Sequence, residues 1–203
     1  MPDGEVKVIA AAFNGEPLKG PNDLIADKKG GIYFTDPGPF YLPNVAPTER
    51  RNTYYIRPSG EIVLLDHDMV YPNGITLSLD EKTLFVDDTF DLYLYAFDVQ
   101  QDGQVKNKRR FVKLHDPEQW PPWGLRSRAD GMAIDSKGRL YVAAASGVQV
   151  IDPNGQYLGT IQTPVVIRNL AFGGPQRKTL YMTALVALYK LQMSSQGPAW
   201  RAK

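Results

Sequence analysis

Residues 73–86 have the sequence Asn73-Gly74-Ile75-Thr76-Leu77-Ser78-Leu79-Asp80-Glu81-Lys82-Thr83-Leu84-Phe85-Val86. This stretch contains a short apolar segment, a polar turn and a second apolar segment that includes an aromatic residue. Apolar runs on either side of a polar turn are typical of an antiparallel β-hairpin. The stretch therefore predicts two paired strands, and the same pattern recurs along the chain.

The hairpin pattern occurs four times, with starts at residues 22, 73, 130 and 168. Two further apolar strands follow each of the first three hairpins, and one follows the fourth. Units of about 40–50 residues with four strands each are typical of a β-propeller. The sequence predicts an all-β fold with blade-like units at approximately 22–70, 73–116, 130–163 and 168–193. No segment shows the 3.6-residue apolar period of a helix.

The four units are fewer than a large closed ring requires. Residues 7–11 have the pattern of an outermost strand, so residues 1–20 are interpreted as an outer strand and linker from a preceding blade. We expect residues 1–203 to be a single propeller domain of about four blades, incomplete at its N-terminus. The unclosed propeller edges would then favour self-association, because open sheet edges pair with other chains.

Composition excludes several classes of function. Lys plus Arg is 23 and Asp plus Glu is 22, a balance that argues against binding to nucleic acid or to an anionic membrane surface. No apolar run is long enough to span a bilayer. The absence of cysteine excludes disulfides and thiolate metal sites. A soluble protein is expected, and the sequence leaves open a cytoplasmic or a periplasmic or secreted location.

The four repeat starts are polar, although each directly precedes an apolar strand. They are Asn22-Asp23, Asn73-Gly74, Asp130-Gly131 and Arg168-Asn169. The innermost strands of a propeller line its central channel, so equivalent starts converge in space. Amide and carboxylate oxygens suit Ca²⁺ or Mg²⁺. Turn chemistry is the alternative explanation, because Asn and Asp before Gly are favoured in any loop.

Four stretches carry a resemblance to a known family. They are Gly20–Leu24 with Tyr33–Pro37, Tyr71–Ile75 with Asp80–Val86, Ala129–Met132 with Gly138–Val142, and Asn169–Gly174. In this order and at these spacings they resemble the senescence-marker-protein/gluconolactonase/luciferin-regenerating-enzyme family over nearly the whole chain. The resemblance implies a six-bladed propeller of the gluconolactonase type that holds one divalent cation and hydrolyses a small-molecule lactone.

The resemblance also implies roles for individual residues. Asn73 and Asp130 match the family's metal-binding Asn and Asp, and Asn22 matches an Asn that contacts substrate or metal. Asp130 matches the carboxylate proposed as general base. The implied cation is Ca²⁺, with Zn²⁺, Mn²⁺ or Mg²⁺ as alternatives. Arg168 at the fourth start is a candidate for binding the substrate's developing oxyanion, although a solvated rim charge is the alternative.

The chain departs from the family pattern at two points. Neither Glu5 nor Glu16 lies in the family's glutamate-ligand motif, and Gly20-Pro21 replaces a substrate-contacting Arg of animal members. We therefore expect a lactonase that is poorly active unless partner blades complete it.

Other interpretations stay open from sequence alone. They are a non-enzymatic binding scaffold of the NHL-repeat type, a strictosidine-synthase-like propeller and a phosphotriesterase-type hydrolase. The segment 120–123 predicts either an apolar lid over the site or packing between blades, and His67 and His115 are expected in surface turns.

Overall fold

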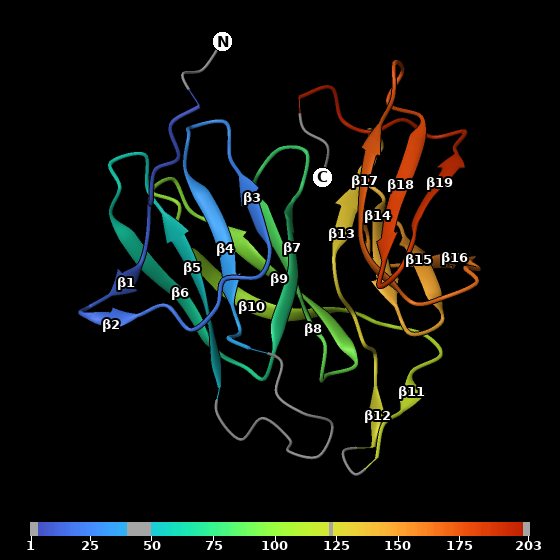
Figure 1. The fold of residues 1–203 in the computed structure, drawn as a ribbon, viewed down its shortest axis with the longest axis horizontal. Coiled ribbons are helices and arrows are strands. Elements are labelled where there is room, and N and C mark those ends of the chain that lie inside the picture. Colours follow the sequence, from blue (N-terminus) through green and yellow to red (C-terminus); the bar gives the residue numbers. More distant parts are fainter. Residues whose placement is uncertain (1–3, 40–49, 122–123, 201–203) are drawn as a thin grey trace.

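The computed structural model describes residues 4–39, 50–121 and 124–200. These residues form strands β1 to β19 and no helix (Figure 1). Within this described part, no helix is therefore present that could cross a membrane. The prediction of an all-β fold is confirmed.

Four antiparallel sheets make up the blades. The first contains β3 (Leu24–Ala26), β4 (Ile32–Asp36), β5 (Arg51–Ile56) and β6 (Ile62–Met69). The second contains β7 (Pro72–Leu77), β8 (Thr83–Asp88), β9 (Tyr93–Val99) and β10 (Val105–Lys113). The third contains β13 (Met132–Ile134), β14 (Leu140–Ala144), β15 (Gly147–Ile151) and β16 (Tyr157–Ile161). The fourth contains β17 (Ile167–Gly173), β18 (Thr179–Ala184) and β19 (Leu188–Gln192).

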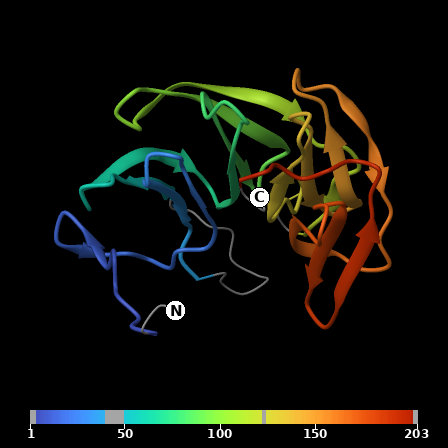
Figure 2. The same ribbon diagram turned by 90° about the horizontal axis from the view of Figure 1, so that it is seen from above.

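The four sheets follow one another around an arc, each turned relative to its neighbour (Figure 2). In every sheet the strands pair in chain order, so each connection is a hairpin. The first blade (blue to teal) and the fourth (orange to red) lie at the two ends of the arc, which is open between them. The arrangement is a propeller-like fold of four blades.

Apolar side chains hold neighbouring blades together. One cluster joins the first and second blades around Tyr33 and Leu77, another joins the second and third around Leu94 and Met132, and a third joins the third and fourth. Full burial of one such aliphatic side chain contributes about 1.5–3 kcal/mol. Packing between blades, more than within them, therefore fixes their relative positions.

The N-terminal segment precedes the first blade. Residues 7–11 form no strand here, and their assignment to an outer strand of a preceding blade stays a prediction. A ribbon of β1 (Ala12–Phe13) and β2 (Glu16–Pro17) follows instead. Phe13 lies 5.2 Å from Tyr54 between ring centroids, so the ribbon covers part of the first blade's free face. An isolated strand at 7–11 would have no neighbouring sheet to complete its hydrogen bonds.

Two connections also differ from expectation. His67 lies within β6, exposed on the outermost strand, and not in a turn. The connection after the second blade contains a ribbon of β11 (Glu118–Gln119) and β12 (Leu125–Arg126). His115 is exposed as expected, and its ring stacks on Tyr157 at 3.8 Å.

Residues 193–200 return from the fourth blade across the turn ends of the other blades (Figure 2). Ser195 shares a hydrogen bond with the Tyr141 hydroxyl, and the Ser136 N–H donates to the Gln196 carbonyl. Further on, the Lys28 ammonium lies 4.1 Å from the ring centroid of Trp200. This segment therefore connects the fourth blade to the third and to the first.

Candidate functional site

The four repeat starts occupy equivalent positions in the blades. In each blade the residue two positions after the start pairs with the second strand, as Leu24 pairs with Phe34 and Met132 with Val142. Ile75 pairs with Val86 and Leu170 with Met182 in the same way. The starts Asn22, Asn73, Asp130 and Arg168 thus share one register at the entry of the inner strands.

Two buried carboxylates fix the chain just before the first two starts. Asp88, at the end of β8, accepts hydrogen bonds from the N–H groups of Val70 and Tyr71 at 2.7 and 3.0 Å. Asp36, at the end of β4, accepts from Lys19 and Gly20 at 2.9 and 2.6 Å. Each carboxyl group thus accepts from two consecutive backbone N–H groups of the segment that leads into the start. The backbone that delivers Asn22 and Asn73 is therefore rigidly held.

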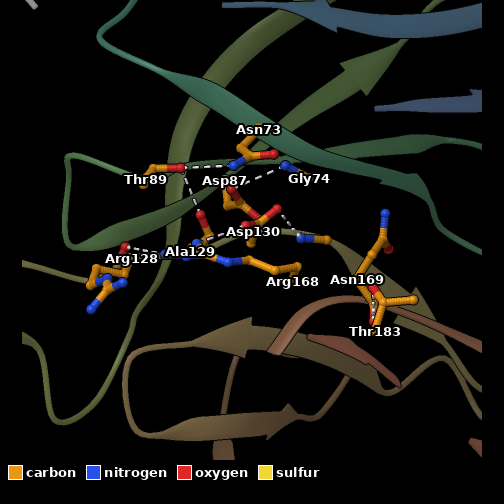
Figure 3. Close-up of polar contacts among 12 residues, drawn as sticks. Asn73, Gly74, Asp87, Thr89, Arg128, Ala129, Asp130, Arg168, Asn169 and Thr183 are labelled. Atoms are coloured by element: carbon orange, nitrogen blue, oxygen red, sulfur yellow. Dashed lines mark hydrogen bonds and ion pairs between the residues drawn. The ribbon is translucent and has the colours of Figure 1, made fainter. Parts of the chain in front are cut away.

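The inner strands of neighbouring blades approach very closely at Gly74 and Gly131, each the second residue of its repeat start. A β-carbon on Gly74 would lie 2.1 Å from the Asp130 carbonyl oxygen and 2.5 Å from Asp87 Oδ2. A β-carbon on Gly131 would lie 2.1 Å from Asn169 Oδ1. The Gly131 N–H also donates to the Arg168 carbonyl at 2.8 Å. This contact brings Asn73, Asp130 and Arg168 together (Figure 3).

The Asn73 side chain is buried and oriented by one hydrogen bond. Its amide nitrogen donates to Thr89 Oγ1 at 3.0 Å, and the Thr89 hydroxyl donates to the Ala129 carbonyl at 2.7 Å (Figure 3). Asn73 Oδ1 has no hydrogen-bond partner among the described residues. A buried acceptor without a partner is costly, so this oxygen is a candidate ligand atom.

Asp130 lies next to Asn73 and is mostly buried. Its carboxylate accepts from the Gly131 N–H at 3.1 Å and lies 3.4 Å from Arg168 Nη1 (Figure 3). Burial raises the pKa of Asp130 to about 6, against the opposing effect of the Arg168 charge. Burial thus disfavours the ionised form of Asp130, and the Arg168 charge opposes that effect.

Asp87 adds a second carboxyl group to the contact between the second and third blades. It is fully buried, accepts from the Gly74 N–H at 3.1 Å and has no partner for Oδ2 among the described residues. Burial, followed by the charge of Asp130, raises the pKa of Asp87 well above its usual range. The site at which the starts converge therefore disfavours a second ionised carboxylate beside Asp130.

Asn22 is exposed at the start of the first blade. Its N–H donates to the Thr35 carbonyl at 2.9 Å. Tyr71, which precedes the second start, is buried, and this burial raises the pKa of its hydroxyl group, with smaller effects of Asn22 and of the Asp130 charge.

Sequence reasoning missed Asp87, Thr89 and Tyr71. Asp87 and Asp88 end the second strand of their hairpin, as Thr35 and Asp36 do in the first blade, and this repeat was a usable signal. Trp120 stacks on Phe90 at 5.4 Å, with the Arg128 guanidinium 5.1 Å from its ring centroid, so its described contacts are those of packing. Residues 122–123 of the expected lid lie outside the described residues.

The donor set fits a hard divalent cation. Asn73 Oδ1 and the Asp130 carboxylate are oxygen atoms of the kind that Ca²⁺ and Mg²⁺ prefer. Within the described ranges, no group of three or more His, Cys, Asp or Glu side chains forms a metal cluster. A cation at this site would therefore depend on amide oxygens as well as carboxylates.

Comparison with known proteins identifies the family. The family model described as SMP-30/Gluconolactonase/LRE-like region matches residues 1–186. The chain therefore belongs to the SMP-30/gluconolactonase/LRE-like family.

Particular relatives support the same assignment. Gluconolactonase of Zymomonas mobilis is 30% identical over 94% of this chain and 55% of its own length. Human regucalcin is 30% identical over 87% of this chain and 58% of its own. The solved structure of a Xanthomonas campestris gluconolactonase matches with a TM-score of 0.76 and 30% identity, over 95% of this chain and 63% of the other. The chain spans roughly half to two thirds of the length of these relatives.

We expect Thr89→Val to destabilise the protein by about 1–3 kcal/mol, because it leaves the Asn73 amide nitrogen and the Ala129 carbonyl without their partner. Thr76→Val is the matched control. Thr76 is fully buried on β7 and its hydroxyl has no partner among the described residues, so the change should be neutral or stabilising. Urea unfolding measures both, and equal effects would contradict the assigned role of Thr89.

Proposed function

We propose that this chain is a metal-dependent hydrolase that opens lactone rings, as a gluconolactonase does. The observation that carries the proposal is the buried, unpartnered Asn73 Oδ1 beside the Asp130 carboxyl group at the convergence of the inner strands. Membership of the family and the similarity to a gluconolactonase and a lactonohydrolase support it.

Asn73 and Asp130 would hold one divalent cation, with Asn22 as a further ligand or a substrate contact. Ca²⁺ is the preferred ion because all three supply hard oxygen donors, and Zn²⁺, Mn²⁺ and Mg²⁺ are alternatives. A relative of known structure, from Agrobacterium tumefaciens, is described as a calcium-binding protein, regucalcin. When bound, such a cation supplies Lewis acidity toward a carbonyl oxygen and a water molecule.

Asp130 would orient the attacking water and act as general base. Burial raises the pKa of its carboxyl group to about 6 in the unliganded chain, whereas a bound cation would lower it, so orienting the water is the role that the metal-loaded site supports best. Arg168 lies at the rim of the site with its side chain 35% exposed, close enough to Asp130 to form an ion pair. Its guanidinium would donate hydrogen bonds to the developing oxyanion of the lactone.

We expect Asp130→Asn to lower kcat/KM for glucono-δ-lactone by at least about 100-fold in the presence of Ca²⁺, because the general base is lost. Asp152→Asn is the control, since Asp152 caps a turn in the third blade away from the site. Release of acid followed in a pH-stat measures the rate. A metal-loaded chain no faster than buffer, or an unimpaired Asp130→Asn variant, would contradict the proposal.

We further propose that the chain self-associates through the two open faces of the arc. Leu24 on the first blade is 56% exposed, and Leu188 and Leu191 on the fourth blade are 69% and 36% exposed. On the inner blades the equivalent strand faces are buried against a neighbour, as Ile75 and Met132 are. Apolar side chains exposed in such groups mark association surfaces.

Sedimentation velocity tests this association over a range of protein concentrations. We expect Leu24→Lys to reduce the fraction of dimer or higher species, because it places a charge on the open face. Leu158→Lys is the control, since Leu158 is 50% exposed on β16 of the third blade, away from both open faces. A purely monomeric protein, or equal effects of the two variants, would contradict the proposal.

A further inference from the structure

Thr89 holds the segment of chain that carries Asn73. It directly follows β8 and is buried, with 5% of its surface exposed. Its backbone N–H donates to the carbonyl of Tyr71, two residues before Asn73, at 3.1 Å. Its side-chain Oγ1 accepts from Asn73 Nδ2 at 3.0 Å (Figure 3). Both the backbone that leads to Asn73 and the Asn73 side chain are therefore bound to Thr89.

The same residue also holds the segment that leads to Asp130. The Thr89 carbonyl accepts from the Arg128 N–H at 3.2 Å. The Thr89 hydroxyl donates to the carbonyl of Ala129, the residue just before Asp130, at 2.7 Å (Figure 3). Thr89 thus joins the second and third blades at the two residues that are the candidate ligands of one cation.

The directions of these hydrogen bonds fix the orientation of the Asn73 amide. A carbonyl oxygen only accepts, so the single proton of the Thr89 hydroxyl goes to Ala129. Thr89 Oγ1 can then only accept from Asn73, and Nδ2 is the donor atom of that amide. The atom that Asn73 offers to a ligand is therefore Oδ1, which has no partner among the described residues.

The hydroxyl group of Thr89 is not needed to build a blade. Thr89 is the third residue after Val86, which pairs with Ile75. The same count from the equivalent pairs of the first, third and fourth blades gives Pro37, Ala145 and Leu185. These three side chains are apolar. The hydroxyl group therefore serves the start of the second blade, where Asn73 lies.

We propose that Thr89 is a positioning residue that turns Asn73 Oδ1 toward a bound divalent cation and fixes the place of Asn73 relative to Asp130. This inference rests on the proposed metal-dependent function. Without the hydroxyl group, the amide is free to exchange its two ends and to present Nδ2, a donor that cannot bind a cation. Loss of a hydrogen bond that orients a metal ligand typically weakens metal binding by about 10- to 100-fold.

Two substitutions separate the hydroxyl group of Thr89 from its methyl group. Thr89→Val replaces the hydroxyl group with a methyl group, whereas Thr89→Ser keeps the hydroxyl group. In calorimetric titrations with Ca²⁺, we expect Thr89→Val to raise the Kd by at least about 10-fold and Thr89→Ser to change it by less than about 3-fold. Thr76→Val is the control and should leave the Kd unchanged, because Thr76 is fully buried and its hydroxyl group has no partner among the described residues.

Two results of these titrations would overturn the proposal. One is an unchanged Kd in Thr89→Val. The other is an equal loss of affinity in Thr89→Val and Thr89→Ser, because packing of the methyl group would then account for the effect. Urea unfolding of each variant confirms that it is folded under the conditions of the titration.

An NMR measurement on the unmodified chain needs neither a variant nor a cation. Nuclear Overhauser effects should connect the Nδ2 protons of Asn73 to the side-chain protons of Thr89. Their absence would show that the amide is turned the other way, and would overturn the inference. If they are seen but the chain binds no cation, the proposed function fails, the positioning role toward a cation fails with it, and the amide orientation stands. If the chain binds a cation and Thr89→Val binds it equally well, this inference alone fails.

Discussion

The close approach of the inner strands at Gly74 and Gly131 is the constraint on which the site depends. At each position a β-carbon would lie 2.1 Å from an atom at the start of the next blade, so only glycine permits the observed contact. Any larger side chain would force the blades apart, and overpacking of this kind typically costs about 1–3 kcal/mol. Because the blades meet here, Asn73, Asp130 and Arg168 converge although they are distant in sequence.

The close approach of the inner strands also brings buried carboxyl groups together. The protein's own charged groups offset the resulting electrostatic cost only in part. Asp87 and Asp130 are largely buried, and the charges of Asp23 and Asp130 raise the pKa of Asp87. Arg168 is the cation that opposes this effect at Asp130, at a distance of 3.4 Å. Two buried oxygens, Asn73 Oδ1 and Asp87 Oδ2, have no partner in the described part of the chain. A bound cation would both offset the electrostatic cost and give these two oxygens a partner. This is the physical reason for placing a cation here.

Local patterns in the sequence predict much of the fold. The features that they do not predict depend on tertiary contacts. The hairpin at 73–86 forms as predicted, because its apolar strands and its turn allow only one pairing register. Residues 7–11 have a strand-like composition but no adjacent sheet to pair with, so they form no strand here. At the site, the shared register of Asn22, Asn73, Asp130 and Arg168 was readable from the repeats. The supporting contacts of Thr89 and Tyr71 were not, because each joins segments that only the arrangement of blades brings together.

Isothermal titration calorimetry with Ca²⁺ and Mn²⁺ on this chain tests whether the converged strand starts bind a cation. We expect the unmodified protein to bind one ion per chain. We also expect Asn73→Ala to lose that binding and Asn154→Ala to keep it, since Asn154 lies in the turn between β15 and β16. Absence of binding by the unmodified chain, or equal binding by the Asn73→Ala variant, would contradict the assignment of the converged strand starts as a cation site.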